Sequence, residues 1–179
     1  MDWFKFLLNN TREDLRETVA IIYGLVAAIL NKPDFEKAVK DLTRSMKEKQ
    51  LEYQHGAVLA VGNSFGRRIL LARIKDPKQQ FSDWRIYKES CQLLIQQLDS
   101  TQNLLLGSGC LAIAELGRCG PLPLPDSCED DSAEQSKLSL VTKLLALVKS
   151  NKTPMRVRER AAMAAGSLCL GDTNFPHRR

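Results

Sequence analysis

The chain has 179 residues, of which 44% are hydrophobic and only 6% aromatic, a composition that can bury a core and disfavours global disorder. The formal net charge of +5 admits an acidic partner, but charges of both signs are dispersed and no aromatic residues interleave with the basic ones for base stacking. The longest apolar run, residues 19–30, is shorter than the roughly 20 residues that cross a bilayer. The N-terminus also lacks the basic start of a signal peptide.

The first predicted helical hairpin covers residues 1–30, with an outer helix over about 2–8 and an inner helix over about 12–30. Thr11 and the three residues after it resemble a capping box, and acidic groups there suit the helix dipole. Apolar spacing predicts one core-facing stripe on the inner helix, formed by Leu15, Val19, Ile22, Val26 and Ile29.

The second predicted hairpin covers residues 34–74, because Pro33 interrupts the preceding helix. Its outer helix spans about 34–48 and its inner helix about 51–74. The apolar stripe predicted for the outer helix consists of Phe35, Ala38, Val39, Leu42 and Met46.

The third predicted hairpin covers residues 84–119, with helices over about 84–98 and 102–118. A loop over residues 120–134 follows, because no helix accommodates its three alternating prolines and acidic run.

The fourth predicted hairpin covers residues 135–170. Thr153 is the expected N-cap of its inner helix and Pro154 the first helical residue. Gly171 is expected to end that helix, which leaves a tail over residues 171–179.

One helical phrase recurs in all four predicted inner helices, with a glycine nine positions after its first residue and small or aliphatic residues before it. The phrases are Leu15–Gly24, Tyr53–Gly62, Ser108–Gly117 and Val157–Gly166. Their glycines lie 38 to 55 residues apart, which brackets the period of HEAT and armadillo repeats. The sequence therefore predicts an all-α fold, an α-solenoid of about four HEAT-like helical hairpins that forms one armadillo-like segment over residues 1–179.

The two ends of this predicted array do not close with polar capping helices. The first outer helix is short and apolar, and no further outer helix follows the fourth hairpin. We therefore expect a fragment or short isoform of a longer array. The alternative is that Trp3 and Phe4 fold back over the first hairpin.

Residues that carry catalytic or metal chemistry are scarce, and we predict no catalytic, cofactor-binding or metal residues and no enzyme activity. His55 is interpreted as a packing or hydrogen-bonding residue, and His177 as a solvated one. Residues 62–66 and 107–109 are glycine-rich but follow no strand, which favours helix crossings. Acidic residues 129–131 lack the order of a calcium loop. The five cysteines, Cys91, Cys110, Cys119, Cys128 and Cys169, lack Cys-x-x-Cys spacing and predict free thiols in a reduced, intracellular protein. Of these, Cys110, Cys119 and Cys169 lie in apolar helical segments and are expected to act as small hydrophobes.

Four stretches carry a resemblance to a known family: Leu7–Arg16, Gln54–Gly62, Ala114–Pro125 and Gly171–Pro176. They resemble one internal region of the proteasome adapter and scaffold protein family, whose members are large HEAT-repeat proteins. The resemblance runs collinearly from about Phe6 to His177. It includes loop residues whose identities a helical-repeat fold does not require. Residues 75–80 and 128–132 depart from it.

The resemblance implies a non-enzymatic adapter that binds the proteasome core and regulatory particles. Family members support proteasome assembly, stability and quality control, and act in ubiquitin-dependent degradation, including degradation at the endoplasmic reticulum. It also implies links to endoplasmic reticulum, endosomes and motor proteins, and a location in the cytoplasm and nucleus or at the periphery of those membranes. No partner-binding residue is carried over. The alternative is a nucleic-acid-binding or nuclear-transport helical repeat, which rests on the net charge alone.

Overall fold

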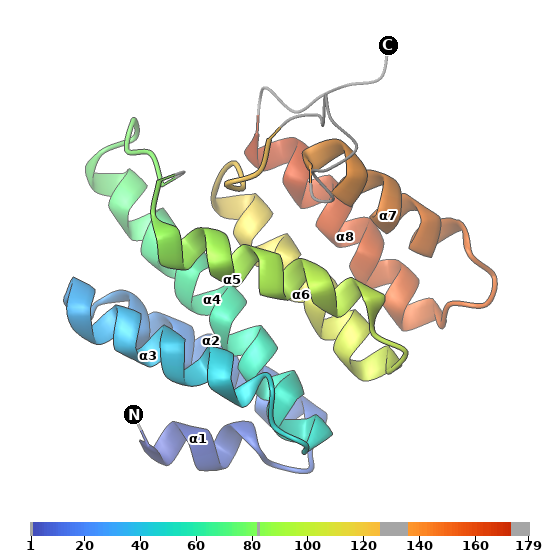
Figure 1. Ribbon diagram of the computed structural model, residues 1–179, viewed down its shortest axis with the longest axis horizontal. Coiled ribbons are helices and arrows are strands. Elements are labelled where there is room, and N and C mark those ends of the chain that lie inside the picture. The colour runs from blue at the N-terminus through green and yellow to red at the C-terminus, as the bar shows by residue number, and fades with distance from the viewer. Residues whose placement is uncertain (1, 82, 126–135, 173–179) are drawn as a thin grey trace. The chain divides into compact units, whose positions relative to one another are not determined.

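The computed structural model describes residues 2–81, 83–125 and 136–172 (Figure 1). Within these ranges the regular elements are eight α-helices and one 3-10 helix, and no strand occurs. The chain divides into two compact units, Met1–Gln79 and Gln80–Arg179. No helix in the described ranges is both long and apolar enough to span a membrane.

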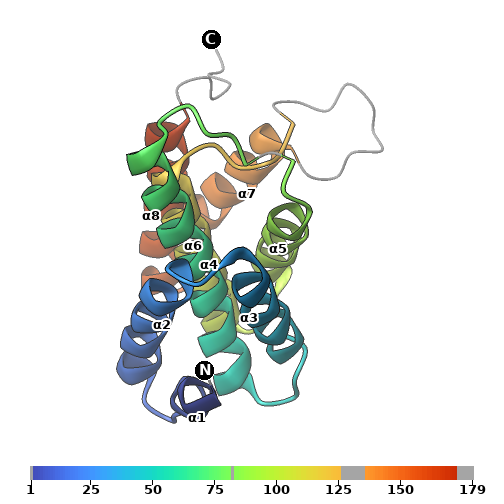
Figure 2. The same cartoon turned by 90° about the vertical axis from the view of Figure 1, so that its left-hand side faces the viewer.

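The first unit contains α1 (Asp2–Leu8), α2 (Glu13–Ala28), α3 (Lys32–Ser45) and α4 (Leu51–Lys75). Helices α2 and α4 lie side by side and share the most extensive contact of the unit, while α3 packs on α4 (Figure 2). Helix α1 contacts both α2 and α4. The unit is therefore a pair of helical hairpins stacked through their inner helices.

The second unit repeats this plan with α5 (Arg85–Gln96), the 3-10 helix η1 (Gln97–Asp99), α6 (Asn103–Cys119), α7 (Lys137–Lys149) and α8 (Met155–Gly171). The inner helices α6 and α8 share the most extensive contact, α5 and η1 pack on α6, and α7 packs on α8. The predicted all-α class of stacked hairpins is confirmed. The predicted loop beyond residue 125 and the tail beyond residue 172 lie outside the described residues.

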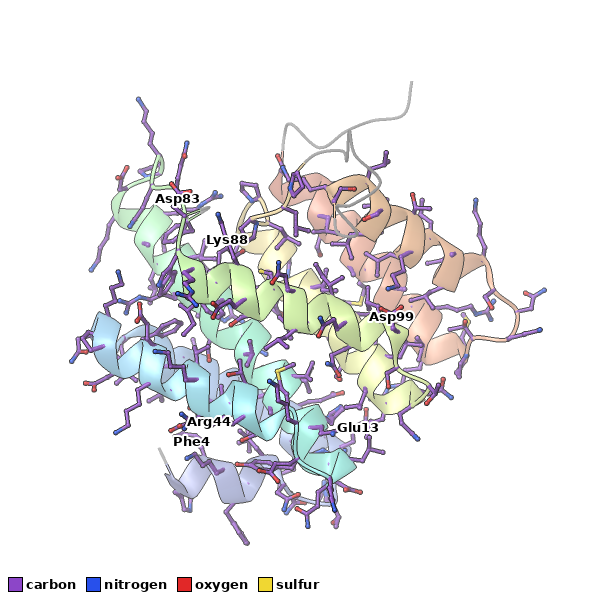
Figure 3. All side chains as sticks on the ribbon, in the orientation of Figure 1. Phe4, Glu13, Arg44, Asp83, Lys88 and Asp99 are labelled. Carbon is purple, nitrogen blue, oxygen red and sulfur yellow. The ribbon has the colours of Figure 1, made fainter. Side chains whose placement is uncertain are left out.

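Helix α1 packs partly on α2. The ring of Phe4, a residue labelled in Figure 3, packs edge-on against the buried ring of Tyr23 at 5.6 Å between centroids. Leu8 is fully buried. Trp3 contacts the Phe4 ring at 5.4 Å but remains 69% exposed, so of the two aromatic residues only Phe4 packs inward.

The predicted caps at Thr11 and Thr153 are wrong. Helix α2 begins at Glu13 after Arg12, which makes no side-chain cap bond. The Thr11 carbonyl instead accepts a hydrogen bond from Arg16. Helix α8 begins at Met155, because Pro154 adopts an extended ψ of 145° and cannot serve as the first helical residue.

Gly171 does not end α8 as a left-handed cap. It is the last helical residue, and Gly120 is the only residue in the described ranges with a positive φ. A Cβ at Gly171 would overlap the carbonyl oxygen of Gly117 on α6. Close helix contact therefore explains this glycine.

Helix α3 starts where a polar cap and a proline coincide. The Asn31 side-chain oxygen accepts the backbone N–H of Asp34 at 3.0 Å, which satisfies a donor that has no partner in the helix. Pro33 lies in the first turn, where its missing N–H costs little.

Replacing Asn31 by alanine is expected to lower the free energy of unfolding by about 1 kcal/mol, because the Asp34 N–H loses its acceptor. Gln102, which precedes α6, makes no side-chain cap bond and is the matched control. Urea unfolding of Gln102→Ala should match the wild type, and an equal loss in both variants would contradict the assignment.

The core-facing stripe of α2 was predicted on the wrong face, except at Val19. Ile22 and Ile29 are 44% and 76% exposed, and Leu15 and Val26 are intermediate. The buried face instead carries mostly small residues, with Arg16, Val19, Ala20, Tyr23, Gly24, Ala27 and Ala28. Small residues let α4 approach closely, so they mark the contact between inner helices. By contrast, every predicted stripe residue of α3 is buried.

The phrase glycines mark a common register between inner helices. A Cβ at Gly24 would lie 2.6 Å from the Cβ of Asn63, the residue after the next phrase glycine. A Cβ at Gly117 would lie 2.9 Å from the Leu168 nitrogen and 3.0 Å from the Ser167 carbonyl carbon, and Ser167 again follows a phrase glycine. The repeated phrase is thus a stacking signal of each unit.

Candidate functional site

His55, interpreted from the sequence as a packing or hydrogen-bonding residue, lies in the interior of the first unit and accepts a hydrogen bond. Its ring is fully buried, and its Nδ1 accepts from Arg16 Nε at 3.1 Å. Arg16 is only 2% exposed, and its Nη1 donates to the carbonyl oxygens of Asn10 at 2.6 Å and Thr11 at 2.9 Å. One guanidinium therefore joins α4 to the start of α2.

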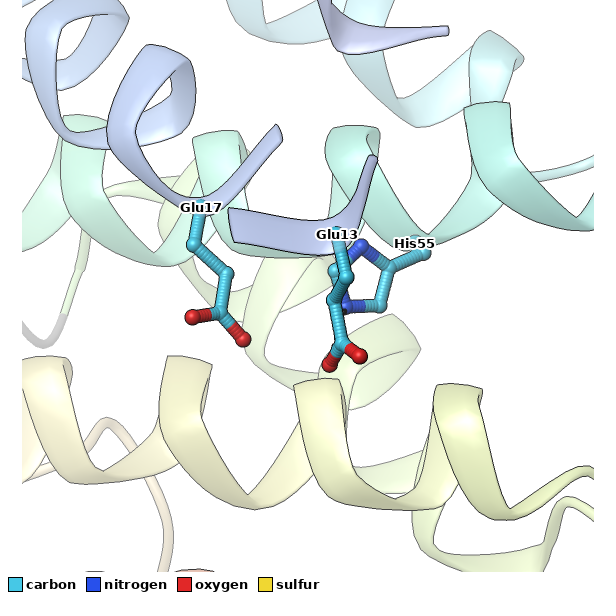
Figure 4. A group of neighbouring side chains, drawn as sticks. All are labelled: Glu13, Glu17 and His55. Carbon is cyan, nitrogen blue, oxygen red and sulfur yellow. Dashed lines mark ion pairs between the residues drawn. The ribbon is translucent and has the colours of Figure 1, made fainter. Parts of the chain in front are cut away.

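Two carboxylates lie on the other side of the His55 ring (Figure 4). Glu13 and Glu17 project from α2, and one ligand atom from each of these glutamates and from His55 lies within 4.8 Å of the others. The closest pair is His55 Nε2 and Glu13 Oε1 at 3.8 Å. Two carboxylates and an imidazole are ligand types that divalent transition metals accept.

The proton arrangement of this group disfavours a metal ion. Arginine remains protonated and can only donate, so Nδ1 of His55 is the acceptor and the proton of the neutral ring is on Nε2. A metal at Nε2 would have to displace that proton beside a buried guanidinium. Metal-bound histidines instead donate their second ring nitrogen to an acceptor. The group is better explained as part of the buried contact between α2 and α4, in which Arg16 of α2 donates a hydrogen bond to His55 of α4.

Three of the cysteines that the structure describes are buried free thiols and one is exposed. Cys91, Cys110 and Cys119 are buried, as small apolar side chains should be. Cys169 is exposed, so the prediction that it packs as a small hydrophobe is wrong. Cys128 lies outside the described residues, as do His177 and residues 129–131.

Burial controls the acidity of two of these thiols. It raises the pKa of Cys110 to about 12, although the charge of Arg160 opposes the shift. Burial also raises the pKa of Cys91, against a smaller effect of a hydrogen bond with Tyr87. Both groups therefore remain thiols at neutral pH, and neither is suited to act as a nucleophile.

In native protein at pH 8, iodoacetamide is expected to modify Cys169 while Cys110 stays unmodified, because only thiolates react. Peptide mass mapping after a timed reaction measures both sites. Unfolding in guanidinium should equalise their rates. Equal native rates would contradict the buried assignment of Cys110.

Two arginines, Arg68 and Arg160, make contacts within the fold. Arg68 Nη1 donates to the carbonyl oxygens of Ala28, at 2.9 Å, and Leu30 at the end of α2. The same guanidinium carbon lies 5.3 Å from the Phe35 ring centroid. Arg160 is 7% exposed, and its Nη1 would lie 3.0 Å from a Cβ built on Gly107. These contacts explain part of the basic excess as helix capping and packing.

A buried ion pair closes the second unit. Lys137 Nζ lies 2.6 Å from Asp172 Oδ2, and the two side chains are 11% and 7% exposed. The pair joins the first residue of α7 to the residue that follows α8. Sequence reasoning missed it, although a lysine opening a helix, against the helix dipole, is a signal for an acidic neighbour.

The inner helices α2 and α8 each expose a face that is largely apolar. On α2 this face contains Thr18, Ile21, Ile22, Leu25 and Ile29, and on α8 it contains Glu159, Ala162, Met163, Gly166 and Leu170. Exposed apolar stripes of this kind mark surfaces that bind proteins. We therefore treat the two faces as the candidate interaction surfaces.

Stacked hairpins with a repeated inner-helix phrase and exposed helical faces define a helical-repeat protein of the armadillo-like class. A family model described as ECM29, ARM-like repeats matches residues 1–116, and the chain belongs to this family. The predicted resemblance is thereby confirmed.

Two curated relatives extend the match over nearly the whole chain. The human Proteasome adapter and scaffold protein ECM29 is 30% identical over 188 aligned residues, which cover 99% of this chain. The Drosophila melanogaster Proteasome-associated protein ECM29 homolog is 27% identical over 187 aligned residues, which cover 92% of it. The match takes in 10% of each relative, so the chain spans about a tenth of their length. No solved structure is significantly similar.

Proposed function

We propose that this chain is a non-enzymatic adapter segment that binds the proteasome core and regulatory particles through its helical surfaces. The observation that carries the proposal is the match of 99% of the chain to a human protein named as a proteasome adapter and scaffold. Repeat arrays bind through many distributed contacts on extended surfaces. The exposed apolar faces of α2 and α8 supply surface of this kind.

The finer role that we propose is support of proteasome assembly, stability and quality control in ubiquitin-dependent degradation. It includes links to endoplasmic reticulum, endosomes and motor proteins. The proposed location is the cytoplasm, with a nuclear fraction and a fraction at the periphery of those membranes. A scaffold of this kind needs surfaces that bind two partners at once, which stacked hairpins provide more readily than a single pocket.

Co-sedimentation with purified proteasomes tests the proposal. The 179-residue chain should move into the proteasome fractions of a glycerol gradient, and the human relative serves as the positive control. A chain that stays at the top of the gradient, while the relative co-sediments, would overturn the proposal.

The same preparation tests the nucleic-acid alternative. We expect no binding to duplex DNA or RNA at physiological salt, because Arg16 and Arg68 already donate hydrogen bonds to backbone carbonyls within the fold. Phosphate contacts release counterions, so true nucleic-acid binding would weaken steeply as salt increases. Tight binding with that dependence would favour the alternative.

A further inference from the structure

Helix α4 is longer than the helix on which it stacks. It contains 25 residues, whereas α2, α6 and α8 contain 16 or 17. Arg68 Nη1 donates to the carbonyl oxygens of Ala28 and Leu30 at the end of α2. Ile69 is the last buried residue of α4. Residues 70–75, the α4 extension, therefore project beyond α2 (Figure 2) by about 9 Å.

The α4 extension carries an apolar edge. Its residues Leu70, Leu71 and Ile74 are 39%, 40% and 71% exposed. Ile74 follows the two leucines by three and four positions, so the three side chains share one face. Asn63, which lies against Gly24 of α2, is two helical turns before Leu70 on that same face. The apolar edge is thus the α2-facing side of α4, uncovered because α2 stops earlier in the middle of the chain.

Positive charge lies around this edge. Arg73 and Lys75 belong to the α4 extension and Lys78 follows it, and none of the three makes an ion pair with a described residue. Lys75 and Lys78 are exposed and Arg73 is half-buried. The only acidic residue between positions 67 and 82 is Asp76, whose Oδ1 accepts the backbone N–H of Lys78 at 3.1 Å. The extension therefore combines exposed aliphatic side chains with an excess of cations.

We propose that the α4 extension is a docking site for an acidic amphipathic segment of a partner protein. The aliphatic side chains of the segment cover the apolar edge and remove it from water. Its carboxylates lie beside Arg73, Lys75 and Lys78, where opposite charge favours the encounter and fixes the orientation. The site is separate from the faces of α2 and α8 and does not rest on the proposed proteasome binding.

A protein segment fits this site better than a nucleic acid or a membrane. Nucleic acids bind chiefly through their phosphates, which need cations and leave an apolar edge uncovered. Membrane binding scales with the apolar area that enters the bilayer, and three aliphatic side chains on less than two helical turns supply little. An amphipathic segment, by contrast, binds through a few apolar anchors with charges around them.

Fluorescence anisotropy with the full chain and a labelled probe tests the proposal. The probe is an amphipathic peptide with leucines on one face and glutamates on the other, and the control peptide has lysines in place of the glutamates. Only the acidic peptide should bind, and its affinity should fall as salt increases, because exposed charges are screened. Tighter binding of the lysine peptide, or no binding of the acidic peptide at low salt, would overturn the proposal.

Matched substitutions on two helices localise the binding. Ile74→Ser and Lys75→Glu should each raise the Kd of the acidic peptide at least about fivefold. Leu145→Ser and Lys149→Glu make the same changes on α7, where Leu145 is 42% exposed and Lys149 is the exposed last residue, and should leave the Kd unchanged. Leu71→Ser is a second apolar variant, and far-UV circular dichroism verifies that each variant folds. Equal losses on both helices contradict a site on α4.

Vesicles of phosphatidylcholine and phosphatidylserine distinguish a protein partner from a membrane. The wild-type chain should stay in the supernatant when these vesicles are pelleted. Pelleting of the wild type that Ile74→Ser abolishes would assign the α4 extension to a membrane and would overturn the proposal.

Discussion

Lys137→Met is expected to lower the free energy of unfolding by about 3–5 kcal/mol, because it leaves the buried Asp172 carboxylate without its lysine. The two groups are 2.6 Å apart and almost completely removed from water. Methionine keeps most of the aliphatic length, so the loss reports on charge rather than volume. Guanidinium unfolding followed by far-UV circular dichroism measures it.

Lys143→Met is the matched control on the same helix. Lys143 Nζ lies 2.5 Å from Asp99 Oδ1, but those side chains are 36% and 66% exposed, so the expected loss is below about 1 kcal/mol. Adding Asp172→Asn to Lys137→Met should recover much of the stability. Equal losses in the two lysine variants would contradict the buried role of Lys137.

Arg16→Met should cost about 3 kcal/mol of unfolding free energy. Its guanidinium makes three hydrogen bonds in the interior, and the substitution leaves the Asn10 and Thr11 carbonyls and the His55 ring without this donor. Arg16→Lys should be destabilising as well, because an ammonium cannot reproduce the planar geometry of the guanidinium.

Arg12→Met provides the comparison for Arg16→Met. Arg12 pairs with Asp14 on the surface at 2.6 Å, and both side chains are mostly exposed, so we expect almost no change in stability. Thermal unfolding of the two variants side by side measures the difference. If Arg16→Met melted at the wild-type temperature, the Arg16 network would have no structural role.

The hairpin pattern could be predicted from sequence because its signals are local. The outer helix α3 exposes one polar face, so apolar spacing identified its core residues from Phe35 to Met46 correctly. The phrase glycines could also be recognised from the sequence, since each follows a run of small or aliphatic residues. The resemblance of Ala114–Pro125 to the proteasome adapter and scaffold protein family then indicated which family of helical-repeat proteins the chain belongs to.

The inner helix α2 shows where the same reasoning fails. Both of its faces are apolar, so periodicity alone does not distinguish the face that packs from the face that stays open. Residue size decides, because close helix contact selects Ala20, Gly24 and Ala27 over Ile22 and Ile29. The predicted caps were misplaced by one residue at each helix start, because Arg12 and Pro154 adopt the extended backbone that precedes the first helical residue.

Buried polar partners could not be predicted because they join residues distant in sequence. His55 was interpreted as a packing or hydrogen-bonding residue, but its partner Arg16, 39 residues away, could not be identified. An arginine within the apolar run of α2 was a usable signal for a buried acceptor. Lys137 and Asp172 likewise meet only once α7 and α8 are folded.

The central claim is that phrase glycines mark inner-helix contacts that are covered at Gly24 and Gly117 and open at Gly166. Replacing each by alanine and measuring the free energy of unfolding, at a concentration where the chain is monomeric, tests this most directly. Gly24→Ala and Gly117→Ala should each lose about 1–3 kcal/mol through overpacking, whereas Gly166→Ala should gain up to about 1 kcal/mol from helix propensity. Shifts of the same sign at all three positions would contradict the stacked arrangement.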